Sequence, residues 1–157
     1  MTGVENFTDL TGRVAVVVGG TSGLGRTVAL GLARAGADVV PSGRRDHMVD
    51  EICAEIGQLG RQTLRRTVDV ADRKSIDTLR DVVRLDLGHV DVLVNAAGRT
   101  ARRPTVEVSE QEWNAILDTN LTGMLRACQS FYGPLRESGR GASLTSRHSL
   151  HLWPSMK

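Results

Sequence analysis

The chain is poor in aromatic residues: only 3% of its 157 residues are Phe, Trp or Tyr. A hydrophobic core must therefore be built mainly from Val, Leu, Ile and Ala. Cysteine is also scarce, because Cys53 and Cys128 are the only two in the sequence. Two cysteines so far apart do not make a disulfide framework, and we expect small buried thiols in a reducing compartment.

Net charge and long apolar runs are lacking as well. The 20 Lys and Arg against 18 Asp and Glu give a net charge of +2, which makes no case for nucleic acid as a partner. No apolar run approaches the length that spans a membrane. Residues 1–9 are polar and lack the apolar segment of a signal peptide. We therefore expect a cytoplasmic protein that has neither a nucleic-acid nor a membrane partner.

Short apolar runs alternate along the chain with stretches of helical periodicity. Pro41 and Gly43 are expected to end the second strand, and Pro134 to end or break the last helix. Ser109 and Glu112 form a capping-box pattern that opens this last helix. The predicted strands are 14–18, 39–40 with its neighbours, 62–70 and 90–94, and the predicted helices are 24–35, 46–59, 72–87 and 109–131. The alternation predicts an α/β fold, a Rossmann-type doubly wound parallel sheet in a three-layer α/β/α arrangement.

A glycine-rich turn joins the first predicted strand to the first predicted helix. Residues 19–25 read Gly-Gly-Thr-Ser-Gly-Leu-Gly. Glycines let the backbone turn sharply and approach a ligand closely, and the N-terminus of the following helix favours a phosphate. The spacing Gly-x3-Gly-x-Gly also suits a plain tight turn, so the turn alone leaves both interpretations open.

Small or polar residues also follow two other predicted strands. Asp69 comes at the end of the third strand, and residues 95–98 come after the fourth. Ligands of parallel sheets bind beyond the carboxyl ends of the strands, so these three ends together predict a nucleotide site. The residues predicted to bind the nucleotide at this edge are Gly19, Thr21, Ser22, Gly23, Leu24, Gly25, Asp69, Asn95, Ala96, Ala97 and Gly98.

In this order, the motifs resemble those of the short-chain dehydrogenase/reductase family, over residues 10–138. The stretch 102–120 is most similar to gluconate 5-dehydrogenase-like and 3-oxoacyl reductase-like members. The segments that carry the resemblance are the glycine motif Gly19-x3-Gly23-x-Gly25, the adenine-contacting pair Asp69-Val70, the segment Asp91 to Gly98, and the helix segment Asp118 to Gly123 with its active-site Asn120.

The resemblance implies an oxidoreductase that transfers a hydride between a nicotinamide dinucleotide and a small alcohol or carbonyl substrate. Asn120 would hold a water molecule of the proton relay. Ser143 lies in a segment similar to the family's serine segment and is the candidate catalytic serine, the alternative being an ordinary serine in a polar stretch. Family helices like 72–87 and 109–131 pack between subunits, which implies a homo-oligomer.

The end of the second predicted strand bears on the choice of cofactor. Gly43 stands where NAD-using members carry an Asp, and Arg44 and Arg45 follow it. A guanidinium group suits a 2′-phosphate. The sequence therefore favours NADP(H) over NAD(H), with Arg44 and Arg45 as further cofactor-binding residues; the alternative is a pair of exposed arginines that bind nothing.

The family's Tyr-x3-Lys motif does not occur in these 157 residues. The single tyrosine, Tyr132, is followed by Arg136 at the lysine position, and the lysines are Lys74 and Lys157. We interpret Tyr132 as a packing residue at a helix end. The chain is therefore expected to be weakly active or inactive, and the alternatives are a non-catalytic dinucleotide-binding module and a degenerate gene product.

Residues 139–157 are expected to be an irregular tail after a dinucleotide-binding domain of residues 1–138. No apolar fifth strand is recognisable in the tail, so we expect the sheet to be truncated after about four strands. The codons of residues 153–157, read one base back, permit Val-Ala-Phe-Tyr-Glu, which resembles the approach to the family's tyrosine and suggests a frameshift. His148 and His151 lack a third ligand at suitable spacing, so no metal site is expected.

Overall fold

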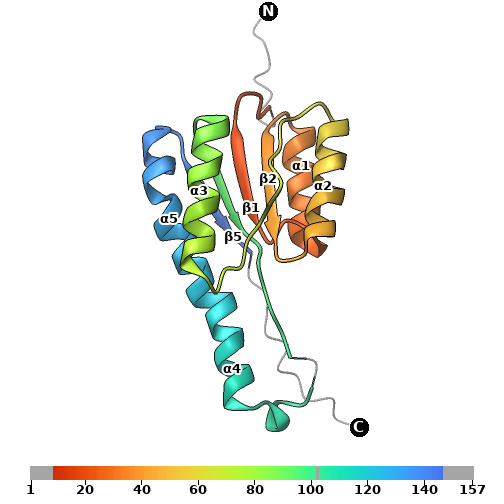
Figure 1. Cartoon of the computed structure of the whole chain (residues 1–157), viewed down its shortest axis with the longest axis vertical. Helices are drawn as coiled ribbons and strands as arrows, with labels where there is room; N and C mark the ends of the chain where they lie inside the picture. The colour runs from red at the N-terminus through yellow and green to blue at the C-terminus, as the bar shows by residue number, and fades with distance from the viewer. Residues whose placement is uncertain (1–8, 102, 147–157) are drawn as a thin grey trace, which may run out of the picture.

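The computed structural model describes residues 9–101 and 103–146, which form a five-stranded parallel sheet with helices on both faces (Figure 1). The order of the strands in the sheet is β3-β2-β1-β4-β5. The strands are β1 (Val14–Val18), β2 (Asp38–Gly43), β3 (Arg66–Thr67), β4 (Val92–Asn95) and β5 (Ala142–Thr145). The helices are α1 (Gly23–Arg34), α2 (Asp46–Gln58), α3 (Arg73–Leu87), α4 (Glu110–Leu117) and α5 (Gly123–Glu137), with a 3-10 turn η1 (Thr105–Glu107) and a π-helical turn η2 (Asp118–Thr122). The predicted Rossmann-type α/β fold is confirmed.

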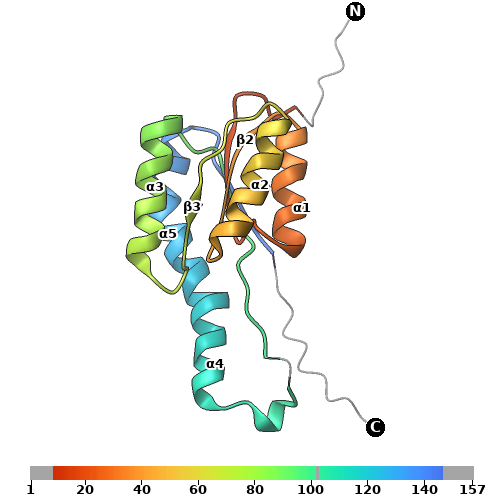
Figure 2. The same cartoon turned by 45° about the vertical axis from the view of Figure 1, so that its right-hand side comes forward.

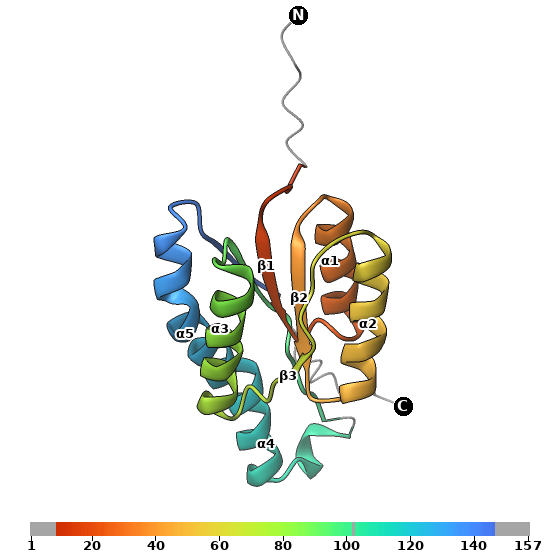
Figure 3. The same ribbon diagram turned by 45° about the horizontal axis from the view of Figure 1, so that its top comes forward.

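Strand β1 lies at the centre of the sheet and is buried on both faces. Val14, Val16 and Val18 belong to the apolar cluster formed with α3 and α5. Ala15 and Val17 belong to the cluster formed with α1 and α2. Figure 3 shows the sheet between these two pairs of helices. Because neighbouring side chains of a strand point to opposite faces, a central strand in three layers must be apolar throughout.

The carboxyl ends of four strands meet at one edge of the sheet. Val18 lies opposite Ser42 of β2 and Asn95 of β4, and Asn95 lies opposite Thr145 of β5. The loop after β4, together with η1 and α4, extends beyond this edge (Figures 1 and 2). Any site built by the strand ends therefore lies beside the segment that leads into α4.

Strand β2 is longer than predicted and β3 is shorter. Pro41 lies inside β2 instead of ending it. The Asp38 amide donates to the Arg13 carbonyl just before β1, and the Val39 amide donates to the Gln62 carbonyl on the other side of the strand. The nitrogen of Pro41 points to the same side as that of Val39, where β3 pairs with β2 only from Ser42 onward. A missing N–H therefore breaks no sheet hydrogen bond. The predicted strand 62–70 forms regular pairs only at Arg66–Thr67.

A fifth strand follows α5, so the expectation of a sheet with about four strands is wrong. Ala142–Thr145 pairs in parallel with β4, and the four residues are all exposed. For these residues the expectation of an irregular tail is also wrong. The sequence of β5 has no apolar run because its side chains are exposed. The strand forms through backbone pairing with its buried neighbour β4. The rest of the predicted tail, residues 147–157, lies outside the described residues.

The long helix predicted after Ser109 is three helical segments. The capping box is confirmed, since Ser109 and Glu112 exchange both hydrogen bonds. The π-helical turn η2 then separates α4 from α5. Helix α5 continues through Pro134 to Glu137, so the expected break at Pro134 is wrong; Gly133 before it has no Cβ to meet the proline ring. In the part of the chain that is described, no helix is long and apolar enough to cross a membrane.

Candidate functional site

The glycine turn between β1 and α1 packs tightly on its neighbours and leaves one side open. A Cβ on Gly19 would overlap the backbone of Ala97, and a Cβ on Gly25 would overlap the carbonyl of Gly19. Gly19 also has a φ of 82°, which residues with a Cβ rarely adopt. A Cβ on Gly23 would meet nothing within 4 Å. Two glycines are thus required by packing, whereas the third borders open space.

The N-terminus of α1 borders the same open space without a side-chain cap. Ser22 precedes the helix in an extended conformation, its side chain makes no capping hydrogen bond, and the first turn has no acidic residue. The first N–H groups of the helix and the positive end of its dipole are therefore available to an anion. This is the arrangement that binds phosphate groups at helix N-termini.

A hollow of about 480 Å³ lies at this edge of the sheet. All but one of the predicted cofactor-binding residues line it, and Gly43 and Thr119 add to its wall. The predicted residues that line it are Gly19, Thr21, Ser22, Gly23, Leu24, Gly25, Arg44, Arg45, Asp69, Val70, Ala96, Ala97 and Gly98. Residues from four separate parts of the sequence therefore meet around one space.

Asn95 is the exception, because it lies buried beneath the hollow rather than in its wall. Its Nδ2 donates to Sγ of Cys128 at 3.4 Å. Its Oδ1 is buried and has no hydrogen-bond partner among residues 9–101 and 103–146. The side chain thus joins β4 to α5 below the site.

The two arginines that line the hollow follow β2, whereas Ala97 follows β4, on the other side of the central strand β1. Arg45 donates from Nη2 to Oγ of Ser22 at 3.5 Å, a long hydrogen bond that links the end of β2 to the glycine turn. Arg44 lines the hollow and is exposed. Both guanidinium groups are therefore within reach of an anionic group held at this end.

Val70 connects the rim of the hollow to the last two helical segments. Its carbonyl accepts a hydrogen bond from Nη1 of Arg126 at 3.1 Å, and Nη2 of Arg126 pairs with Asp118 of η2 at 2.9 Å. A Cβ on Gly123 would lie 2.8 Å from the Val70 side chain. Sequence reasoning missed Arg126, because neither contact follows a local pattern that the sequence displays.

Asn120 lies in the π-helical turn η2 and holds the segment that follows β4. Its Oδ1 accepts from the Arg99 N–H at 2.7 Å, and its Nδ2 donates to the Arg99 carbonyl at 2.9 Å. Both ends of the side-chain amide are therefore used on one backbone unit. Asn120 does not line the hollow itself, but it fixes the loop that leaves the hollow at Gly98.

Ser143 does not lie at the carboxyl end of its strand. It is exposed in β5 opposite Leu93, two residues before the strand ends. Ser146 lies directly after the strand, and its N–H and Oγ donate to the Asn95 carbonyl at 2.9 and 3.2 Å. Of the two serines, Ser146 is the one at the edge where the strand ends meet.

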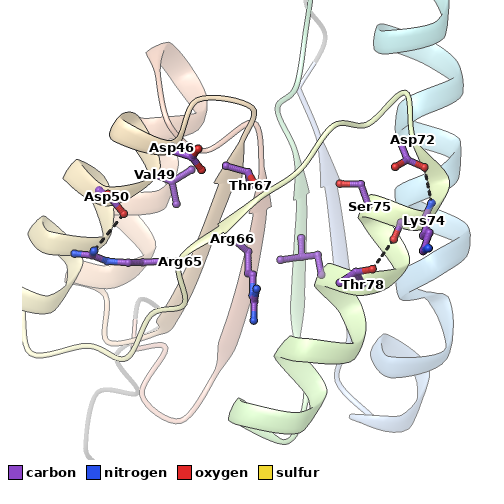
Figure 4. Close-up of a pocket in the computed structure, with 11 residues that line it drawn as sticks. Asp46, Val49, Asp50, Arg65, Arg66, Thr67, Asp72, Lys74, Ser75 and Thr78 are labelled. Atoms are coloured by element: carbon purple, nitrogen blue, oxygen red, sulfur yellow. Dashed lines mark hydrogen bonds and ion pairs between the residues drawn. The ribbon is translucent and has the colours of Figure 1, made fainter.

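Tyr132 lies on α5 with 65% of its surface exposed, so its interpretation as a packing residue is wrong. Neither it nor Arg136 lines the hollow. Lys74 lines a second hollow, of about 500 Å³, between α2 and α3 beside β3 (Figure 4). None of the predicted cofactor-binding residues lines this second space.

The wall of the second hollow includes an ion pair and a helix cap. Arg65 pairs with Asp50 at 3.3 Å, and Asp72 caps α3 by accepting the Lys74 N–H at 2.9 Å (Figure 4). The described residues contain no group of three or more His, Cys, Asp and Glu that could hold a metal ion. The histidine pair at 148 and 151 lies outside them.

Comparison with known proteins gives a family match over most of the chain. The family model described as short chain dehydrogenase matches residues 13–155. A hydroxyacyl-CoA dehydrogenase of Mycobacterium tuberculosis, ChsB1, is 35% identical over 150 residues, covering 90% of this chain and 47% of that protein. The 2-dehydro-3-deoxy-D-gluconate 5-dehydrogenase of Escherichia coli is 34% identical, covering 90% and 55%. The chain thus spans about half the length of the curated relatives it matches.

Comparison with solved structures also finds a dehydrogenase and a reductase. The structure of a 7α-hydroxysteroid dehydrogenase in complex with NADH and 7-oxo glycochenodeoxycholic acid matches with a TM-score of 0.82 and 28% identity, covering 88% of this chain and 54% of that one. The L-sorbose reductase of Gluconobacter frateurii, in complex with NADPH and L-sorbose, matches with a TM-score of 0.82 and 28% identity, covering 88% and 53%. One neighbour holds NADH and the other NADPH, so the shared fold leaves the choice of cofactor open.

Proposed function

Because this chain belongs to the short chain dehydrogenase family, we propose that the hollow at its strand ends binds a nicotinamide dinucleotide, with NADP(H) favoured over NAD(H). The observation that carries the proposal is the open side of the turn at Gly23, beside the uncapped N-terminus of α1. A pyrophosphate placed there meets free N–H groups and no Cβ. Asp69 and Val70, which also line the hollow, are the proposed contacts of the adenine.

The proposed preference for NADP(H) rests on charge at the end of β2. Gly43 brings no carboxylate, and Arg44 and Arg45 bring two positive charges to the wall of the hollow. A carboxylate at this point would bind two ribose hydroxyls and repel a phosphate, whereas a guanidinium favours the phosphate. Ser22, held by Arg45, adds a hydroxyl on the same side.

We propose that the residues of this chain supply only part of the chemistry of the family's reaction. A bound nicotinamide would supply the hydride that is exchanged with an alcohol or carbonyl substrate. Asn120 would fix the loop beside it, and Ser146 is better placed than Ser143 to orient a substrate oxygen. No Tyr-x3-Lys occurs in the 157 residues to move the proton. We therefore propose nucleotide binding with little or no turnover by this chain.

A titration with NADPH and NADH, followed by nicotinamide fluorescence, tests the proposal. The expected result is saturable binding of both nucleotides, with NADPH bound more tightly. Arg44→Asp should weaken NADPH and spare NADH. Unchanged NADPH affinity in Arg44→Asp would refute the assignment of the 2′ position. A chain that binds neither nucleotide would refute the proposed function and favour a degenerate gene product.

An assay of alcohol oxidation and carbonyl reduction then distinguishes a chain that only binds the dinucleotide from one that also catalyses hydride transfer. Binding without turnover identifies a dinucleotide-binding module. Turnover at a rate typical of enzymes, on the order of 1–1,000 per second, would refute the proposed loss of activity.

We also propose that the chain self-associates through α4, η2 and α5. Leu121 of η2 and Leu125 of α5 are 59% and 53% exposed, and Tyr132 of α5 is exposed as well. Apolar side chains gathered on one exposed segment favour protein contacts. Light scattering coupled to gel filtration tests this, and a strictly monomeric chain at all concentrations would contradict it.

A further inference from the structure

Thr21 of the glycine turn and Gly43 at the end of β2 lie in contact in the wall of the hollow. A Cβ on Gly43 would lie 2.6 Å from Oγ1 of Thr21 and 3.0 Å from its Cγ2. Thr21 is 6% exposed, so its side chain is confined on nearly all sides. Both residues belong to the wall that also carries Arg44 and Arg45.

We infer that Thr21 is a specificity-determining residue of the dinucleotide site, because its side chain occupies the space that an acidic side chain at position 43 would need. The inference rests on the proposed function. A site for a ribose with two free hydroxyls needs a carboxylate at the end of β2. With Thr21 in place the chain is restricted to a residue without Cβ there, which leaves Arg44 and Arg45 to set the charge.

The backbone of the turn cannot easily move Thr21 aside. The amides of Gly19 and Gly20 both donate to the Ser42 carbonyl, at 2.8 and 3.0 Å. Ser42 is the residue directly before Gly43, so the turn and the end of β2 are joined where the contact lies. A displacement of Thr21 would therefore break hydrogen bonds of buried backbone groups.

A rotation of the Thr21 side chain relieves the contact only in part. Threonine has two heavy atoms on Cβ, and both lie within 3.0 Å of the position that a Cβ on Gly43 would take. The Cβ of Thr21 itself lies 3.4 Å from that position, which is an ordinary contact distance. Truncation to alanine therefore removes the conflict, whereas each staggered rotamer of threonine leaves at least one heavy atom within 3.0 Å of that position.

Four proteins test the inference: the natural chain, Thr21→Ala, Gly43→Asp and the double variant. The dissociation constants of NADPH and NADH are measured for each by fluorescence titration and by calorimetry. In Gly43→Asp both affinities should fall, because the new side chain strains the turn against its hydrogen bonds to the Ser42 carbonyl. In the double variant NADH should bind roughly tenfold more tightly than in Gly43→Asp, and the preference for NADPH should be lost.

Thr119→Ala combined with Gly43→Asp is the matched control, since Thr119 lines the hollow and is not among the atoms that a Cβ on Gly43 would meet. It should not restore NADH binding. The inference is overturned if Gly43→Asp alone binds NADH as well as the double variant does, or if the control restores binding equally. The proposed function fails separately, if the natural chain binds neither nucleotide.

Gly43→Ala gives a readout that needs no nucleotide. It adds only the conflicting Cβ, so its melting temperature should fall, and Thr21→Ala in the same chain should recover most of the loss. Gly31→Ala is the control, because a Cβ there would meet nothing within 4 Å. Additive effects of Thr21→Ala and Gly43→Ala on the melting temperature would show that the two side chains do not compete for space, which overturns the inference.

Discussion

Arg140 donates from Nε to Oδ1 of Asp91 at 3.1 Å, and this pair ties the segment before β5 to the start of β4. The other oxygen of the buried Asp91 carboxylate accepts the Val14 N–H at 3.0 Å. One side chain thus joins three neighbouring strands at their amino ends, opposite the candidate site. Since β5 is exposed along its whole length, this ion pair and the β4 ladder contribute to holding it in place.

We predict that Asp91→Asn destabilises the chain by about 1–3 kcal/mol, because it leaves a half-exposed arginine and a buried amide with weaker partners. Burial by itself would raise the pKa of Asp91, but the Val14 hydrogen bond, the Arg140 hydrogen bond and the charges of His89 and Arg140 together lower its pKa below the ordinary value. Urea unfolding at pH 7 measures the difference between the natural chain and the variant.

The same pair of proteins gives a pH dependence. A carboxylate with a lowered folded-state pKa contributes stability that is complete above the unfolded pKa of about 3.9 and is lost as the pH falls through the folded pKa. The stability difference between the natural chain and Asp91→Asn should therefore shrink below about pH 4. A difference that stays constant or grows on acidification would mean that the carboxylate is not charged in the folded chain.

Two glycine variants should separate folding from binding. Gly19→Ala should unfold or strongly destabilise the chain, because a Cβ overlaps the Ala97 backbone at a φ of 82°. Gly23→Ala has a φ of 52° but open space around it, so we expect a loss of about 1–2 kcal/mol and a folded chain. Its NADPH affinity should nevertheless fall sharply, because the added methyl group lies where the pyrophosphate is proposed.

Thermal melting and NADPH titration of both variants check this. If Gly23→Ala binds NADPH as the natural chain does, the open side of the turn is not where the nucleotide lies.

Arg126 should support the adenine side of the hollow without contacting the nucleotide. We predict that Arg126→Ala lowers the free energy of unfolding by about 1–3 kcal/mol and weakens NADPH binding, since the Val70 carbonyl and Asp118 both lose their partner. Arg84→Ala is the control. Its pair with Glu137 at 2.8 Å joins two exposed side chains and should contribute less than about 1 kcal/mol. Equal effects of the two variants would contradict the supporting role of Arg126.

The sequence predicted those features that depend on neighbouring residues. The three helices before β4 follow from apolar residues at helical spacing, and the capping box at Ser109 from two side chains three residues apart. The glycine turn could be located from the sequence because any residue with a Cβ at Gly19 or Gly25 would overlap the neighbouring backbone. These are local signals, and the structure differs from them by about one residue at helix ends.

Features that depend on pairing between distant segments could not be predicted in the same way. Strand β5 has exposed side chains and therefore no apolar pattern, so its existence follows only from the edge that β4 offers. Arg126 contacts a carbonyl 56 residues away. The contact of Thr21 with Gly43 arises from the register of β1 and β2, which sets Val18 opposite Ser42. Neither the composition nor the periodicity of the sequence indicates which of these distant residues lie close together.

The side chain of Asn120 should determine how firmly the loop after β4 is held. Its amide accepts the Arg99 N–H at 2.7 Å and donates to the Arg99 carbonyl at 2.9 Å. In Asn120→Ala both bonds are lost, and hydrogen exchange of the Arg99 amide should become faster. Asn120→Asp keeps an acceptor for that N–H but turns a donor toward the carbonyl into a second acceptor. The Arg99 amide should therefore exchange more slowly in Asn120→Asp than in Asn120→Ala. The free energy of unfolding should nevertheless be lower in Asn120→Asp, because a side-chain oxygen then faces the Arg99 carbonyl oxygen. Equal exchange rates in the natural chain and Asn120→Ala would mean that the loop is held by other contacts, and the proposed role of Asn120 beside the hollow would fall with it.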